Sequence, residues 1–146
     1  MSAIELLIEY AKLRKKILRL MSQMEELKSQ AESLSAWTDG DRVQSSHDPD
    51  KIGRVIARLA DKQDECCELM IEAIDRMNEI EAILNDLDNP DYSLVLQYKY
   101  IRGLTWDEVA ENMYCTPRWA MILRDRALRA MDKIINDNIR QDAEIT

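Results

Sequence analysis

The stretch LLIEYAKLRKKILRLMSQMEELKSQAESL, residues 6–34, spaces its apolar side chains at alternating steps of four and three residues. Such spacing over four heptads predicts a long helix with an apolar seam along one side. The predicted seam comprises Leu6, Tyr10, Leu13, Ile17, Leu20, Met24, Leu27, Ala31 and Leu34.

A second long helix is predicted where the same alternation restarts. Between the two, residues 36–50 hold Gly40, Pro49 and a cluster of turn-forming residues, which predicts a loop. Helices joined in this way pair antiparallel, so we expect residues 1–88 to form a long antiparallel, coiled-coil-like helical hairpin. The second predicted seam comprises Ile52, Ile56, Leu59, Gln63, Cys66, Met70, Ala73, Met77, Ile80, Leu84 and Leu87.

The first helix carries more apolar surface than a two-helix seam uses. Leu7, Ala11, Leu18 and Met21 form a stripe beside the seam. If it were exposed, this stripe would exceed the ~300–600 Å² patch of a typical monomer. We therefore expect a homodimer that buries it, with packing against the helix at residues 90–102 of the same chain as the alternative.

The composition of the 146-residue chain favours an all-α fold. Hydrophobic residues make up 46% and charged residues 33%, with only three Gly and three Pro. A single His and three Cys without paired spacing cannot build a structural zinc site, and no nucleophile or phosphate-loop motif occurs. We expect no enzymatic activity and no cofactor. No apolar run reaches the ~18 residues of a membrane span and no signal peptide is visible, so we expect a cytoplasmic protein without a membrane partner.

The net charge of −8 hides a basic segment. Residues 1–93 hold 12 Lys and Arg against 20 Asp and Glu, whereas residues 94–133 hold seven against five. The basic character is therefore confined to the part of the chain that follows the predicted hairpin.

Helix start and stop signals divide this C-terminal part into three short-spaced helices. Asn89 before Pro90 predicts a first helix, with Leu94, Tyr98 and Ile101 on one face, that stops at Gly103. Two further starts are signalled by Thr105-Trp106-Asp107-Glu108, which has the form of a capping box, and by Thr116-Pro117.

The last two of these helices have the spacing of a helix-turn-helix. Ala110 is small enough to let two helices cross closely, and Ala120 and Leu123 follow at the spacing that fills the junction. The second helix carries more basic than acidic residues, which suits DNA phosphates.

The segment NPDYSLVLQYKYIRGLTWDEVAENMYCTPRWAMILRDRALRAM, residues 89–131, resembles region four of bacterial sigma factors and its phage-encoded relatives. Together with the preceding heptad helices, it resembles a family of small phage and prophage transcriptional regulators of Gram-positive bacteria. The resemblance implies a DNA-binding helix-turn-helix domain over residues 89–138, followed by a tail at 139–146.

Two features depart from that pattern. Tyr114 stands where the turn usually carries Gly, so the turn either avoids a left-handed backbone or bears a steric cost. Met121 and Ile122 occupy positions expected to face the groove, where they can contact thymine methyl groups but cannot form hydrogen bonds to bases.

We therefore expect a regulator that places the helix from Pro117 in the major groove of promoter DNA. Arg118 is the candidate for base reading, and the start of this helix favours phosphate. The alternative is a protein-interaction module that binds host RNA polymerase or a defence factor without specific DNA readout. The DNA-contacting candidates are Arg118, Thr116, Trp119, Ile122, Arg124, Arg126, Thr105 and Lys99.

Overall fold

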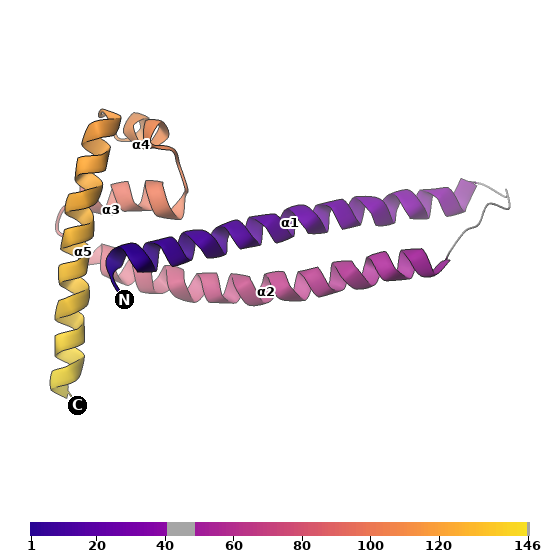
Figure 1. Ribbon diagram of the computed structural model, residues 1–146, viewed down its shortest axis with the longest axis horizontal. Coiled ribbons are helices and arrows are strands. Elements are labelled where there is room, and N and C mark those ends of the chain that lie inside the picture. The colour runs from indigo at the N-terminus through magenta and orange to yellow at the C-terminus, as the bar shows by residue number, and fades with distance from the viewer. Residues whose placement is uncertain (41–48, 146) are drawn as a thin grey trace. The chain divides into compact units, whose positions relative to one another are not determined.

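A computed structural model describes the backbone of residues 1–40 and 49–145 and the side chains of residues 1–36 and 50–145. Every element in these ranges is helical, and none is long and apolar enough to cross a membrane. The elements are α1 (Ala3–Gly40), α2 (Pro49–Asn85), α3 (Pro90–Leu96), the π-helical turn η1 (Gln97–Ile101), α4 (Trp106–Asn112) and α5 (Pro117–Ile145) (Figure 1).

The chain divides into two compact units, and the division runs through both long helices. One unit joins Met1–Leu13 with Ala73–Thr146, and the other is Arg14–Glu72. The expected boundary at residue 88 therefore lies inside the first unit. The reason is that the first turns of α1 and the last turns of α2 bury apolar side chains, among them Leu6 and Ile80, in the unit that contains α3 and α5.

Both long helices are longer than predicted on the loop side. Residues 36–40 of the expected loop continue α1, and α2 begins at Pro49. Proline fits this place because the first residues of a helix have no intrahelical acceptor for their N–H groups. Residues 41–48 of the expected loop lie outside the described residues. The expected tail at 139–146 is also helical up to Ile145, where α5 ends.

Burial along α1 follows the predicted seam. The five members from Leu6 to Leu20 are buried, and the four from Met24 to Leu34 are half-buried. The extra stripe divides instead. Leu7 is fully buried within the chain and Ala11 is half-buried, whereas Leu18 and Met21 are exposed. Leu7 therefore cannot contact a second copy, and the prediction that it belongs to the dimer surface is wrong.

The predicted seam of α2 is correct except at three positions, Ile56, Gln63 and Met70, which are exposed. Cys66, Ala73 and Ile80 are buried as expected, but Val55 is buried where Ile56 was predicted, and Ile56 is 53% exposed. Gln63 and Met70 are likewise exposed. Adjacent apolar pairs, such as Val55 with Ile56, fit two heptad frames equally well, and helix packing selected the other frame.

The C-terminal helices share a core in the first unit. α3 and α4 both pack on α5, and Figure 1 shows them beside its first half. The buried face of the segment 90–101 is wrong in the prediction, because Val95, Leu96 and Tyr100 are buried while Leu94 is exposed.

A long-range hydrogen bond links the start of α1 to α5. The backbone N–H of Ala3 donates to Oδ1 of Asp132 at 2.7 Å. Ser2 and Glu5 complete the helix start, because the Glu5 amide donates to Ser2 Oγ and the Ser2 amide donates to the Glu5 carboxylate. A carboxylate at a helix N-terminus is also favoured by the helix dipole.

We expect Asp132→Ala to lower the free energy of unfolding by about 1–2 kcal/mol, because it removes a charge-assisted hydrogen bond at a helix start. Asp132→Asn, which keeps an acceptor oxygen, should lose less. The measurement is chemical denaturation, with the exposed Asp137→Ala on the same helix as the control. Equal losses for Asp132→Ala and Asp137→Ala would contradict this assignment.

Candidate nucleic-acid interface

The connection between α4 and α5 is a tight turn with a left-handed residue. After α4, the Cys115 amide donates to Ala110 O at 3.0 Å and the Tyr114 amide donates to Glu111 O at 3.3 Å. These two bonds form a Schellman motif, which places Tyr114 at the position that usually holds Gly. Tyr114 has a φ of 54° and its side chain is 97% exposed. Of the two alternatives left open by the sequence, the turn therefore adopts the left-handed conformation.

Capping residues fix the starts of the three C-terminal helices, as predicted. The side chain of Asn89 accepts from the Asp91 amide, and Thr105 Oγ1 accepts from the Glu108 amide. Thr116 Oγ1 accepts from the Trp119 amide at 3.2 Å. Gly103, with a φ of 70°, follows the first of these helices as expected. The hydroxyl oxygen of Thr105 and of Thr116 thus accepts a hydrogen bond from an amide of its own helix, and the hydroxyl proton can still be donated to another group.

The first half of α5 has a buried side and an exposed side. Ala120, Leu123 and Ala127 are buried, and Ala110 of α4 is buried with them, as predicted for the helix junction. The opposite side presents basic, aromatic and aliphatic groups to solvent. These residues, which we name the α5 face, are Arg118, Trp119, Met121, Ile122 and Arg126.

The α5 face brings four of the predicted contact residues together. Arg126 lies over the Trp119 ring, with its guanidinium carbon 5.3 Å from the ring centroid. Stacking of this kind orders a cation without neutralising it. Arg118 and Ile122 lie one helical turn apart on the same side. Thr116 lies at the helix start, where free amide groups and the helix dipole favour anions.

Lys99 and Arg124, two other predicted contacts, are engaged within the protein. Lys99 Nζ and the Arg124 guanidinium lie 4.7 and 4.9 Å from the centroid of the Trp106 ring. Lys99 also donates to Leu104 O at 3.2 Å, and Arg124 Nε pairs with Asp125 at 3.1 Å. These interactions connect η1, α4 and α5, so both cations stabilise the arrangement of the helices that present the α5 face.

Tyr100 lies beside this cluster. Burial raises the pKa of its hydroxyl, while the nearby Arg124, which donates a hydrogen bond to it, acts in the opposite direction. The phenol is therefore neutral at physiological pH and serves as an acceptor for Arg124. The roles of Tyr100 and Trp106 were not predicted, because their contacts with Arg124 depend on how η1, α4 and α5 pack.

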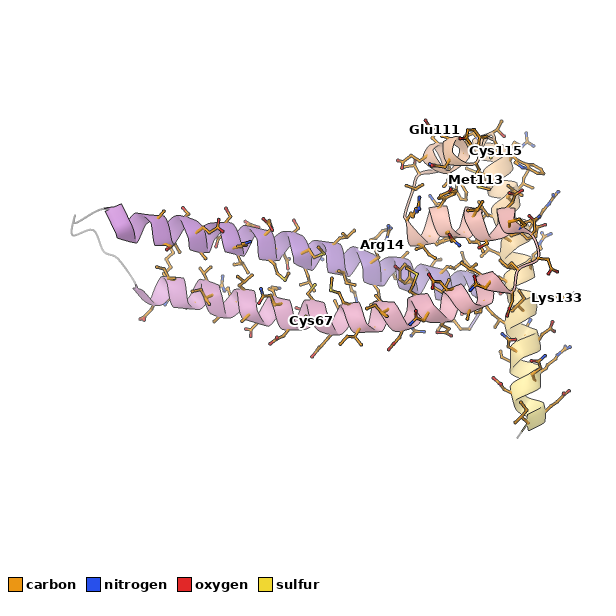
Figure 2. The ribbon with its side chains drawn as sticks, turned by 180° about the vertical axis from the view of Figure 1, so that it is seen from behind. Arg14, Cys67, Glu111, Met113, Cys115 and Lys133 are labelled. Atoms are coloured by element: carbon orange, nitrogen blue, oxygen red, sulfur yellow. The ribbon has the colours of Figure 1, made fainter. Side chains whose placement is uncertain are left out.

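Negative charge flanks the α5 face. Asp107, Glu108 and Glu111 are exposed on α4, and Asp125 is exposed on α5. These carboxylates limit the number of phosphates that the surface can hold. Figure 2 shows Glu111 and Cys115 at the α4 end of this region. Within the described residues, no group of His, Cys, Asp and Glu side chains is arranged to hold a metal ion.

Residues 33–132, more than half of the chain, match the family described as "Protein of unknown function (DUF1492)". The match includes the last turns of α1, the whole of α2, α3, η1 and α4, and the first half of α5. No curated protein and no solved structure is significantly similar to the chain.

We expect Tyr114→Gly to raise the free energy of unfolding by about 0.5–1 kcal/mol, because glycine adopts a positive φ without the steric cost that a side chain meets. Thermal or urea denaturation measures the change. Tyr114→Ala is the matched control, since it removes the exposed ring but keeps the Cβ that causes the cost. A gain of equal size for Tyr114→Ala would refute the backbone explanation.

Proposed function

The chain belongs to the DUF1492 family of proteins of unknown function, and we propose that it is a phage-type DNA-binding transcriptional regulator. In this proposal α4 and α5 act as a sigma region-four-like helix-turn-helix within residues 89–138, and α5 enters the major groove of promoter DNA. Residues 1–88 act as a helical hairpin for dimerisation or polymerase contact. The protein would work in the cytoplasm of the bacterial host.

The observation that carries the proposal is the composition of the α5 face. Arg118 is exposed in the first turn of α5, and Arg126 lies two turns further along the helix. The side of α5 opposite them is buried on α3 and α4, so the exposed side is the one that can approach a groove. A short helix, a tight turn and a longer helix with an exposed basic side is the arrangement that such DNA-binding modules use.

Each residue of the face has a distinct proposed role. Arg118 reads a base edge through its planar guanidinium, and Ile122 contacts a thymine methyl group. Thr116 and Trp119 hold a phosphate at the start of α5, and Arg126 contacts the DNA backbone. Thr105, Lys99 and Arg124 take supporting roles, because Thr105 caps α4 and the two cations hold Trp106.

A second function is favoured by the aliphatic part of the same face. Met121 and Ile122 are exposed side by side, and the neighbouring α4 presents three carboxylates. An apolar centre with a charged rim is typical of a protein-binding surface. In this second candidate the module binds host RNA polymerase or a defence factor, and contact with DNA is incidental.

We expect Arg118→Ala to weaken binding to a specific site by about 1–3 kcal/mol and to weaken binding to random DNA less. The specific site is first obtained by selecting bound duplexes from a random pool with the full-length protein. Titrations at fixed salt then compare both duplexes, because phosphate contacts depend strongly on salt. Arg140→Ala, an exposed arginine near the end of α5, is the control. An equal loss on both duplexes would demote Arg118 to a phosphate contact.

A gel-shift experiment with and without RNA polymerase separates the two candidates. The regulator should shift the selected duplex alone, whereas the interaction module should shift a promoter duplex only when polymerase is present. The double variant Met121→Ala, Ile122→Ala should weaken the polymerase-dependent shift more than the shift by the protein alone, because these side chains form the apolar centre of the protein-binding surface. Direct DNA readout would be rejected if no sequence were enriched from the random pool and the promoter duplex were shifted only in the presence of polymerase.

A further inference from the structure

One side of the unit Arg14–Glu72 carries exposed apolar side chains among polar ones. On each helix, the residues that follow a seam position by one step lie on a common side. On α1 these include Arg14, Leu18, Met21 and Glu25, and on α2 they include Ile56, Gln63, Cys67 and Met70. We name this surface the Leu18–Met70 face.

The two helices contribute to the same surface. They run antiparallel in this unit (Figure 1), and each turns its seam toward the other. For antiparallel right-handed helices that face each other, a step of one residue past the seam leads to the same side of the pair. One groove is lined by Lys16 to Gln23 of α1 and by Lys62 to Leu69 of α2, so Leu18 and Met21 lie opposite this segment of α2.

The large apolar side chains of this face are unusually exposed. Leu18 is 55%, Met21 45% and Met70 40% exposed, and Cys67 is exposed beside them on α2 (Figure 2). The opposite side of the unit is charged and polar. Its grooves are lined by Lys16, Arg19, Gln23, Glu26, Gln30, Arg58, Asp61, Lys62 and Glu65, together with Leu20, Leu27 and Leu69. The contrast between the two sides marks the Leu18–Met70 face as an interaction surface.

The spacing of the α1 residues on this face is the same when it is followed in the opposite direction. Arg14 precedes Leu18 by four residues, and Glu25 follows Met21 by four. A two-fold axis midway between Leu18 and Met21 would place Leu18 against Met21 and Arg14 against Glu25 of a second copy.

The charged groups at the ends of the face have no ion-pair partner among the residues that the structure describes. Nε of Arg14 is buried without a hydrogen-bond partner. Among the residues that the structure describes, neither Arg14 nor Glu25 takes part in a salt bridge. A buried, unpaired donor on a cation is costly, and a carboxylate near the guanidinium offsets that cost.

We propose that the Leu18–Met70 face binds a second copy of this chain in an antiparallel, two-fold symmetric four-helix arrangement. Leu18 packs against Met21 of the other copy, and Arg14 pairs with Glu25 twice. Self-matching of this kind is what an isologous interface requires. The surface uses no residue of the α5 face, so the proposal stands or falls independently of DNA binding.

The first test is the oligomeric state of the full-length protein by sedimentation equilibrium over a range of concentrations. The native chain should dimerise, and Leu18→Glu and Met70→Glu should each shift the dissociation constant upward at least about tenfold, because each buries a charge in the interface. Gln30→Glu, an exposed position on the charged side, is the matched control and should have no such effect. A native chain that stays monomeric, or a dimer indifferent to Leu18→Glu, overturns the proposal.

A charge exchange tests the pairing. Arg14→Glu and Glu25→Arg should each weaken the dimer, and the double variant should recover most of the native affinity, since the pair is then restored in reverse. Circular dichroism confirms that each variant is folded, and the exposed Glu25→Arg keeps the test valid if Arg14→Glu is unstable. Additive losses in the double variant would overturn the antiparallel arrangement.

Discussion

The apolar stripe along the first half of α5 is the constraint on which the candidate interface depends. Ala120, Leu123, Ala127 and Met131 are buried, α5 packs on α3 and α4, and two of the four residues are alanines that allow close approach. Burial of one side of a helix necessarily presents the other side to solvent. The exposure of Arg118, Ile122 and Arg126 therefore follows from the packing of residues that never touch a ligand.

The polar interactions around this stripe determine which basic side chains remain free to contact a ligand. Lys99 and Arg124 approach the Trp106 ring from η1 and α5, and Arg124 also meets Tyr100 and Asp125. A cation held in this way is positioned by the protein, whereas Arg118 is exposed in the first turn of α5. The basic excess counted in the sequence is thus divided between holding the fold together and facing solvent. This division explains how a chain with a net charge of −8 can still present a basic helix.

In the Arg14–Glu72 unit, the sequence of α2 fits two heptad frames, and packing against α1 determines which frame is buried. In α2, residues 55 and 56 are both apolar, as are residues 69 and 70. The heptad repeat is satisfied by either member of each pair. The structure buries Val55 and half-buries Leu69, which leaves Ile56 and Met70 outside. The exposed stripe is therefore a consequence of an apolar arc wider than one partner helix covers.

Local interactions are what the sequence by itself determined. The starts at Asn89, Thr105 and Thr116, the stop at Gly103 and the seam of α1 depend on residues within one or two turns of each other, so spacing and residue type were sufficient. Tertiary structure decided the rest. The hydrogen bond from Ala3 to Asp132 joins residues 129 positions apart, and no pattern announces it. Leu7 and Leu18 belong to one stripe in the sequence, yet only packing within the chain buries the first and leaves the second exposed. The physical reason is that helical periodicity specifies which side chains share a face, whereas the partner that covers the face is supplied by distant parts of the chain.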